Sequence, residues 1–364
     1  MKTKRFKTSL TAVLLALGLS SAAPILSAEG GGAEAPQTAE PREYALERHT
    51  LHMGTLINAK LFGATPEAVK HYAIVFEDKV TDYDDLMSVH KDTPLNEVNR
   101  RAGEPVEVPC EIADMTKQAL AIADETNGAF EPMIGPVVNL WKIGFGGEHV
   151  PSDEAIAEAV SKVDRSKVRV WREGGRCMMQ IAKGQSIDMG AIAKGFIGQR
   201  LSDILKHEGM TRGVLDLGGN IVAVGEKSDG RSWRIGIQHP AESRGGYFAV
   251  ASAKDESVIT SGAYERYFEE NGKRYSHILD PKTGRPAKTD ISSVTIIDRD
   301  GARADALCTA LFAMGWDRAE AFLRTHPELK ALVMHADMKQ AVMTPAAASS
   351  VTSADPSVKL TVLK

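Results

Sequence analysis

Several signals that would assign this chain to a common class of protein are missing from its sequence. There is no G-x-G-x-x-G or G-x-x-x-x-G-K-[ST] fingerprint, no H-E-x-x-H pair and no nucleophile elbow, which argues against Rossmann, P-loop, zincin and hydrolase-type sites. Cysteine is scarce: Cys110, Cys177 and Cys308 are scattered, with no C-x-x-C, so a zinc site is not expected. One thiol at least must stay unpaired. We expect the thiols to be mostly buried and structural, and the sequence leaves a single disulfide open.

A strong positive charge and a long apolar run in the body of the chain are also missing. The net charge is -4, and no basic stripe occurs outside the N-terminus, which excludes the usual footprint of a nucleic-acid-binding protein. The first residues, by contrast, combine Lys2, Lys4, Arg5 and Lys7 with an apolar stretch over 10–19 and small residues after it. This pattern predicts a secretory signal peptide over residues 1–28, cleaved near Ala23 or Ala28.

Residues 29–42 are rich in Gly, Ala, Glu and Pro, and predict a disordered linker. No cysteine stands near the cleavage site, so no lipid anchor is expected. We therefore expect an exported protein, in the periplasm if the source is a Gram-negative bacterium. No partnership with nucleic acid and no stable membrane anchor are expected.

The remaining chain is long enough to bury a sizeable core, since 43% of its 364 residues are hydrophobic. Apolar residues recur at helical spacing over 66–87 and 112–126, and again over 302–313 and 318–325. Short strand-like runs crowd the region 213–297, and a further pair covers 329–335 and 340–344. This order predicts an α+β domain over 43–345, with largely antiparallel sheets and inserted helices. Residues 346–364 predict a loose tail with one weak strand.

The stretch Asp188–Met189–Gly190–Ala191–Ile192–Ala193–Lys194–Gly195 is the most informative segment of this domain. It follows a strand-like run over 178–187 and precedes a helical pattern that ends near 205, and Asp188 occupies the expected helix N-cap. A turn of small residues with one lysine at a helix start suits a phosphate or pyrophosphate. The alternative is a strand–turn–helix joint that binds no ligand.

A second candidate lies at the start of the helix near residue 302. Asp305 and Thr309 are four residues apart, so their oxygens fall on one helix face. A carboxylate and a hydroxyl form a hard, oxygen-only half-site, which suits Mg²⁺ completed by substrate phosphates. The alternative is that Asp305 only caps the helix while Thr309 bonds back to a carbonyl.

His277 and Asp280 form a third candidate, at the end of a strand. Histidine is the usual proton carrier near neutral pH, and Asp280 is close enough in sequence to face the same site. Alternatively, 280–284 is only a turn. Two further turns of small residues follow strands, over 216–220 (Asp-Leu-Gly-Gly-Asn) and 260–264 (Thr-Ser-Gly-Ala-Tyr); each could approach a ligand or be plain turn chemistry.

Taken together, these segments make the sequence similar to the ApbE family, the FAD:protein FMN transferases, from about residue 50 to 343. The resemblance is carried by motifs in family order: Met53–Gly54–Thr55, Met87–Ser88, Gly128–Ala129–Phe130, Gly135–Pro136–Val137–Val138–Asn139–Leu140–Trp141, the 188–195 stretch, Ser276–His277–Ile278–Leu279–Asp280–Pro281 and Ala304–Asp305–Ala306.

This resemblance implies the members of the site. The flavin contacts carry over to Met53, Ala129, Phe130, Glu131, Asp188, Lys194 and Leu279. The metal contacts carry over to Ala191, through its carbonyl, and to Asp305, Cys308 and Thr309. Cys308 is a poor sulfur ligand for a hard cation, so its carbonyl or a water is expected to serve. Two positions depart from the family: His90 stands where a stacking Tyr is common, and Glu131 stands where Asp is usual.

The activity implied is the Mg²⁺-dependent transfer of FMN from FAD to a Thr or Ser hydroxyl of another protein, with release of AMP. His277 is the expected general base, and Asp280 is the residue expected to orient it and a weaker candidate for the base. The implied acceptors are exported subunits of Rnf-type or sodium-pumping NADH:quinone reductase-type complexes, or periplasmic flavin reductases. Two alternatives stay open at this point: an Mg²⁺-dependent FAD pyrophosphatase, and an FAD-binding protein without turnover.

Overall fold

The computed structural model describes residues 43–88, 91–242, 245–262 and 266–364. The predicted signal peptide, the linker and His90 lie outside the described residues. None of the helices found in these ranges combines the length and the apolar character that a bilayer crossing would need.

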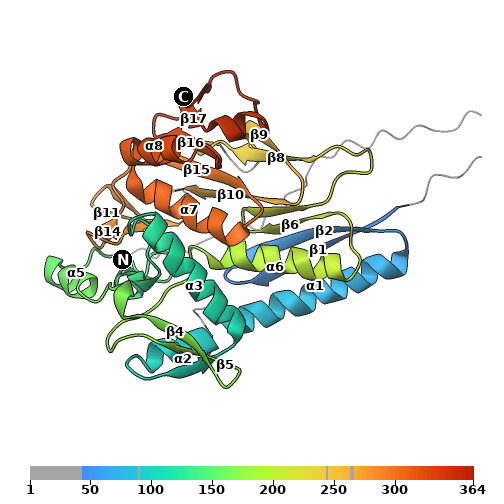
Figure 1. Ribbon diagram of the computed structural model, residues 1–364. Coiled ribbons are helices and arrows are strands. Elements are labelled where there is room, and N and C mark those ends of the chain that lie inside the picture. The colour runs from blue at the N-terminus through green and yellow to red at the C-terminus, as the bar shows by residue number, and fades with distance from the viewer. Residues whose placement is uncertain (1–42, 89–90, 243–244, 263–265) are drawn as a thin grey trace, which may run out of the picture.

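A nine-stranded sheet forms the centre of the molecule (Figure 1). Every neighbouring pair in it is antiparallel except β17 and β19, which run parallel. In spatial order the strands are β1 (Tyr44–His52), β2 (Thr55–Gly63), β6 (Gly213–Leu217), β7 (Asn220–Val224), β10 (Glu256–Gly262), β15 (Ile291–Asp298), β16 (Lys330–His335), β17 (Gln340–Met343) and β19 (Lys359–Val362). The predicted α+β class with largely antiparallel sheets is confirmed.

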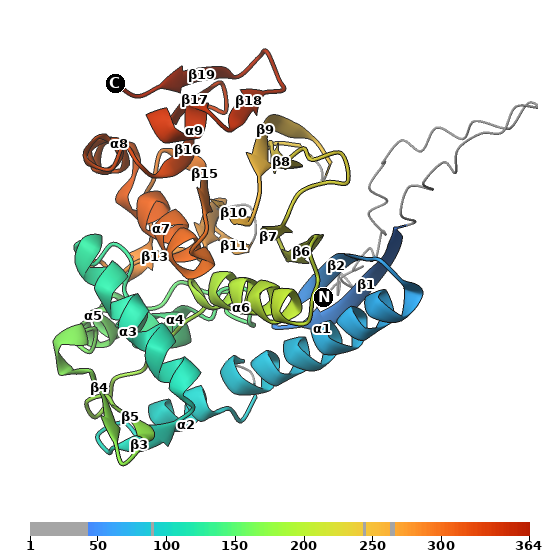
Figure 2. The ribbon, with the colours of Figure 1, turned by 45° about the vertical axis from the view of Figure 1, so that its right-hand side comes forward.

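Helices cover one face of this sheet, as Figure 2 shows. They are α1 (Pro66–Met87), α6 (Ala193–His207) and α7 (Gly301–Met314), and α3 (Cys110–Glu125) packs against α7. The Thr65 hydroxyl caps α1 by accepting the N–H of Ala68, and Pro66 occupies the first helical position, where its missing N–H has no cost. The main core lies between these helices and the inward side chains of the strands.

The opposite face is covered by a second sheet, β18 (Val351–Ser353), β9 (Tyr247–Ala253) and β8 (Trp233–Gln238). Because strand side chains alternate between faces, Ile259 and Ile296 belong to the helix-covered core, whereas their neighbours Val258 and Ile297 pack against this second sheet.

Smaller elements extend the domain at its other end. The sheet β3 (Val106–Val108), β5 (Arg176–Gln180), β4 (Arg169–Glu173) lies near α2 (Pro94–Arg100), with the short helix η2 (Arg165–Lys167) just before β4. Another group surrounds Trp141 and consists of η1 (Pro132–Ile134), α4 (Gly135–Trp141), α5 (Asp153–Val160) and the hairpins β11 (Tyr267–Glu270) with β12 (Lys273–Ser276) and β13 (Leu279–Asp280) with β14 (Arg285–Pro286). Helix α8 (Trp316–Thr325) follows α7.

The C-terminal segment differs from the expected loose tail. After α9 (Pro345–Ala348), β18 pairs with β9 and β19 pairs with β17, so residues 351–362 extend two sheets. Backbone hydrogen bonds make these pairings, and they require few large apolar side chains. The low apolar content of the segment therefore did not reveal its structure.

A disulfide joins the first residue of α3, Cys110, to Cys177 in β5, while Cys308 is a buried free thiol. The bond closes a separation of 67 residues, which restricts the unfolded chain. We expect the double variant Cys110→Ser, Cys177→Ser to lose about 3 kcal/mol of unfolding free energy, measured by urea denaturation. Reduction of the wild type should lower its unfolding free energy in the same way. Cys308→Ser keeps the disulfide, so reduction should still lower its stability as it does in the wild type. Equal unfolding curves for the oxidised and reduced wild type would contradict the prediction.

Candidate functional site

Two glycine-containing turns meet at one edge of the main sheet. Met53 and Gly54 connect β1 to β2 with φ values of 51° and 69°, and Gly218 and Gly219 connect β6 to β7 with φ values of 71° and 99°. A Cβ placed on Gly218 would lie 2.2 Å from the Thr55 Oγ1. Glycine is therefore required there for the turns to touch, and the contact fixes Met53 beside the start of β7.

Asp84, which the sequence analysis did not single out, holds the Met53 turn. Its Oδ1 accepts the Met53 N–H at 3.0 Å, and its Oδ2 lies 3.2 Å from the His52 Nδ1 and 2.7 Å from the Lys91 Nζ. Burial opposes ionisation of Asp84, but the hydrogen bonds from Lys91, His52 and Met53 outweigh it and lower the pKa of this carboxyl. A carboxylate on the buried stripe of α1 was the signal that could have identified it.

The 188–195 stretch forms a turn and a helix start, but not with the predicted cap. The preceding strand β5 ends at Gln180, the helix N-cap is Ile192, and Ile192 makes no side-chain cap. The Asp188 Oδ1 instead accepts the Gly190 N–H within the turn, at 2.8 Å. The prediction that Asp188 caps the helix is therefore wrong.

The cap of α6 comes from another helix. The Asp305 Oδ2 in α7 accepts the N–H of Gly195, one of the unpaired donors of the first turn of α6, at 2.9 Å. A Cβ on Gly195 would lie 2.0 Å from the Gly301 carbonyl oxygen, so the two helices meet backbone to backbone. The buried Asp305 carboxylate thus lies at the positive end of α6, next to Lys194.

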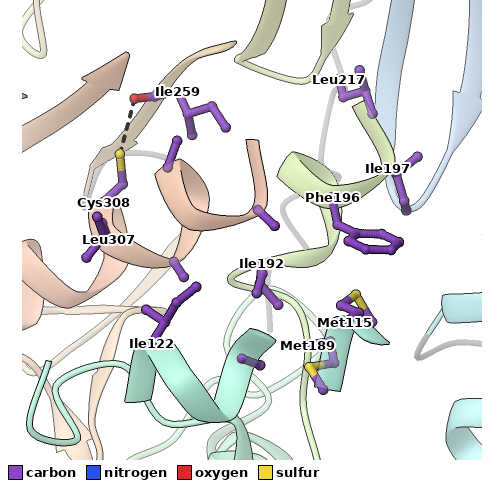
Figure 3. Packing of buried hydrophobic residues seen from close by; sticks show 14 of the residues in the cluster. Met115, Ile122, Met189, Ile192, Phe196, Ile197, Leu217, Ile259, Leu307 and Cys308 are labelled. Atoms are coloured by element: carbon purple, nitrogen blue, oxygen red, sulfur yellow. Dashed lines mark hydrogen bonds between the residues drawn. The ribbon is translucent and has the colours of Figure 1, made fainter. Parts of the chain in front are cut away.

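Among the candidate metal ligands, Cys308 is the one residue with a sulfur atom. The Cys308 thiol is fully buried and donates to the Ile259 carbonyl at 3.2 Å (Figure 3). Burial raises the pKa of this thiol well above its ordinary value, with the nearby Asp305 charge adding to the effect. A protonated, donating thiol does not act as a thiolate ligand.

The remaining donors fit Mg²⁺. Asp305 is a buried carboxylate at the first turn of α6, Thr309 is half-buried one turn along α7, and Ala191 offers a carbonyl just before α6. Within the part of the chain that the structure describes, no cluster of three or more His, Cys, Asp or Glu side chains could hold a metal. A site with one carboxylate suits a cation that borrows phosphate oxygens from its substrate.

His277 directly follows β12 and is oriented by a backbone carbonyl. Its Nδ1 lies 3.1 Å from the carbonyl oxygen of Arg266. Because a carbonyl only accepts, Nδ1 carries the proton, and Nε2 is an acceptor with no hydrogen-bond partner among the residues that the structure describes. Burial is the main cause that lowers the pKa of His277 to about 4; the Arg266 carbonyl opposes this shift, and the positive charges of Arg266 and Lys194 add to it. His277 is therefore a neutral base near pH 7, within the field of Lys194.

Asp280 does not orient this imidazole. Its Oδ1 accepts the Lys282 N–H at 2.9 Å, and its carbonyl accepts the Gly284 N–H at 2.8 Å, so its polar groups organise the turn between β13 and β14. The interpretation of Asp280 as the partner of His277 is corrected: that partner is Arg266, which the sequence analysis did not name. The Arg266 guanidinium lies over the Phe145 ring, 5.0 Å from its centroid, and near Gly54.

The Ala129–Phe130–Glu131 run lies after α3, where Asp188 and Pro132 are joined by a backbone hydrogen bond. Phe130 is buried, and both Glu131 oxygens are engaged: Oε2 pairs with the Arg165 guanidinium at 2.9 Å and Oε1 accepts the Met133 N–H at 3.1 Å. Leu279 is also buried, in the cluster around Trp141.

Two hollows border these residues. One, of about 510 Å³, is lined by Glu131 and Arg165. The other is a groove of about 810 Å³ that reaches Ser276, the neighbour of His277, and is lined by Trp141, Arg285, Lys288 and Trp316 among others.

Comparison with known proteins identifies the family to which this chain belongs. The model of the ApbE family matches residues 53–333. The chain belongs to the ApbE family. An FAD:protein FMN transferase of Treponema pallidum is 38% identical to it over 316 residues, which cover 83% of this chain and 87% of that protein. An FAD:protein FMN transferase of Klebsiella pneumoniae is 35% identical over 252 residues, which cover 69% of this chain and 78% of that protein.

Solved ApbE structures are similar to this chain in fold as well as in sequence. The ApbE protein of Thermotoga maritima superposes with a TM-score of 0.76 at 28% identity, covering 84% of this chain and 99% of that one. The apo flavinyl transferase ApbE of Pseudomonas stutzeri gives a TM-score of 0.73 at 27% identity, covering 85% and 97%. The ApbE-like fold expected from the sequence motifs is therefore confirmed.

Proposed function

We propose that this protein is an FAD:protein FMN transferase, which moves the FMN half of FAD onto a Thr or Ser hydroxyl of another protein and releases AMP. The observation that carries the proposal is the neutral His277, whose Nε2 can accept a proton within the electrostatic field of Lys194. The half-site of Asp305 and Thr309 at the start of α6 and the names of the curated relatives support it.

In this mechanism the hydroxyl oxygen of the acceptor attacks the phosphorus of the FMN phosphate. The bond from that phosphorus to the bridging oxygen breaks, and AMP leaves with the electron pair. The His277 Nε2 takes the hydroxyl proton, since a Thr or Ser hydroxyl is a weak nucleophile near neutral pH. Nε2 is the basic nitrogen because the Arg266 carbonyl accepts the proton on Nδ1.

Phosphate binding is assigned to the start of α6. The positive end of the helix and the Lys194 ammonium favour the negative pyrophosphate, and the small residues of the turn allow close approach. Asp305, Thr309 and the Ala191 carbonyl would hold Mg²⁺, which supplies neutralisation of phosphate charge when bound. Met53, Asp188, Leu279 and the 129–131 run are proposed to contact the flavin nucleotide, as the family motifs imply.

The setting of the reaction follows from two further features. We propose that the acceptor protein docks against the groove that Ser276 lines, next to His277 in the sequence. The disulfide between Cys110 and Cys177 suits an oxidising compartment, which supports export to the periplasm after cleavage of the predicted signal peptide, and hence exported acceptor proteins.

The test is incubation of the mature protein with FAD, Mg²⁺ and an exported acceptor domain, followed by a denaturing gel read for flavin fluorescence and by quantification of AMP. We expect a fluorescent acceptor band that disappears with EDTA, together with equimolar AMP. AMP and free FMN without a band, in the presence of several acceptors, would instead establish a pyrophosphatase. FAD retained with no AMP formed would establish a binding protein.

A further inference from the structure

Asn220, the last residue of the 216–220 turn motif, has no role in the site described so far. It is the first residue of β7 and only 4% of its surface is exposed. Its Nδ2 is buried and has no hydrogen-bond partner, the one such side-chain nitrogen or oxygen found among the residues that the structure describes. Buried donors are nearly always paired in folded proteins because an unpaired one destabilises the native state. An exception calls for an acceptor that arrives with a ligand.

The amide lies on the face of the sheet that α6 and α7 cover. Side chains alternate along β7, so Asn220 shares a face with Val222 and Val224, which belong to the main core. The Val222 Cγ2 would lie 2.9 Å from a Cβ on Gly198 of α6. Asn220 is thus in line with residues that pack under α6, one step nearer to the turn edge of the sheet.

The neighbouring strand ties the same position to α7. Asn220 pairs with Ile259 of β10, whose carbonyl accepts the thiol of Cys308. Cys308 precedes Thr309, the hydroxyl of the proposed metal half-site. The amide therefore lies on the side of the sheet that carries Asp305 and Thr309.

The turn that precedes Asn220 leaves room for a ligand. Gly218 is packed against Thr55, which follows the Met53 turn, whereas a Cβ on Gly219 would meet no atom within 4 Å. Asn220 therefore directly follows two glycines, one packed tightly against Thr55 and one beside open space. Its side chain lies on the face of the sheet that α6 covers.

We infer that Asn220 is a substrate-contacting residue whose Nδ2 donates a hydrogen bond to a phosphate oxygen of bound FAD. The inference deepens the proposed function and rests on it. A phosphate oxygen is an acceptor that cannot donate, which matches an unpaired amide N–H, and Lys194 and the start of α6 favour a phosphate on this side of the sheet. A neutral donor adds a bond there without competing for the cation.

The experiment compares wild type with Asn220→Leu, which removes the amide at similar volume, and Asn220→Asp, which replaces the donor with a negative acceptor. Dissociation constants for FAD and for riboflavin, which has no phosphate, are measured by flavin fluorescence in EDTA, so that no turnover occurs. We expect the FAD dissociation constant to rise at least about tenfold in Asn220→Leu and further in Asn220→Asp, with riboflavin binding unchanged within twofold.

Thermal unfolding of the ligand-free proteins separates a binding role from a structural one. Gln185→Leu is the matched control, because the buried Gln185 amide is fully engaged with Lys162, Asp164 and Ala182. We expect Gln185→Leu to lower the melting temperature and Asn220→Leu to leave it equal or higher.

The outcomes are distinct. Equal FAD affinity in wild type and Asn220→Leu would overturn the inference while leaving the proposed function intact. Parallel loss of FAD and riboflavin affinity would overturn the phosphate assignment, and a lower melting temperature with loss of both ligands would show that Asn220 is structural. A wild-type protein that fails to bind FAD at all would remove the proposed function and this inference together.

Discussion

His277→Asn is expected to lower the rate of FMN transfer about 100- to 10,000-fold while leaving FAD affinity near that of the wild type. Asparagine can still donate to the Arg266 carbonyl, the partner of Nδ1, but it has no basic nitrogen to take the proton of the acceptor hydroxyl. The measurement is the rate of acceptor labelling at saturating FAD and Mg²⁺, with FAD binding measured separately.

His71→Asn is the matched control, because His71 is an exposed imidazole on α1 that pairs with Glu208, and it should transfer at the wild-type rate. Full transfer by His277→Asn would remove His277 from the mechanism. Loss of transfer together with loss of FAD binding would make it a binding residue instead.

The pH dependence of the same reaction gives an independent check on His277. Its pKa is lowered from 6.5 to about 4, so the basic form that accepts a proton dominates at every pH above about 4. The rate limb due to this residue should therefore lie near pH 4 instead of near 6.5, with activity falling as pH falls through it. In the unfolded chain the imidazole protonates already below its ordinary pKa of about 6.5. Native stability should therefore decrease as pH falls from about 6.5 to about 4, and His277→Asn should lose that contribution.

Asp305→Asn is expected to reduce Mg²⁺-dependent transfer about 1000-fold, with only a small change in stability. Asparagine keeps an oxygen that can accept the Gly195 N–H, but it removes the single carboxylate of the proposed metal half-site, and Mg²⁺ favours charged oxygen ligands. The rate is followed as a function of Mg²⁺ concentration, with thermal unfolding of the same samples.

Asp305→Ala separates the two roles of this carboxylate. It removes the cap of α6 as well as the metal ligand, so we expect it to be as inactive as Asp305→Asn and also about 1 kcal/mol less stable. A fully active Asp305→Asn at ordinary Mg²⁺ would show that the cation binds elsewhere, and equal stability of the two variants would show that the cap contributes nothing.

The pattern of the sequence could predict the parts of the site that depend on local spacing. Asp305 and Thr309 fall on one face of α7 because helical periodicity alone decides it. The antiparallel strands followed from short apolar runs between turn residues. Asp188 shows the limit: the rule for N-caps is local, but the true cap of α6 comes from Asp305, more than a hundred residues later.

The residues missed by sequence reasoning act through tertiary contacts. Arg266 orients His277 with its backbone carbonyl, which any residue type would offer. Asp84 reaches Met53 only because α1 packs beside β1 and β2. The open amide of Asn220 becomes visible only when the partners of every buried polar atom are known.

The backbone contact between Gly195 and Gly301 has a consequence for binding. With no side chain between the helices at this point, their backbones are in direct contact, and the Asp305 carboxylate is held at the first turn of α6. FAD would then enter a preformed cradle, and little of its binding energy would go into ordering the protein. The tight packing of Gly195 against Gly301, two residues without functional groups, would in this way contribute to the affinity for FAD.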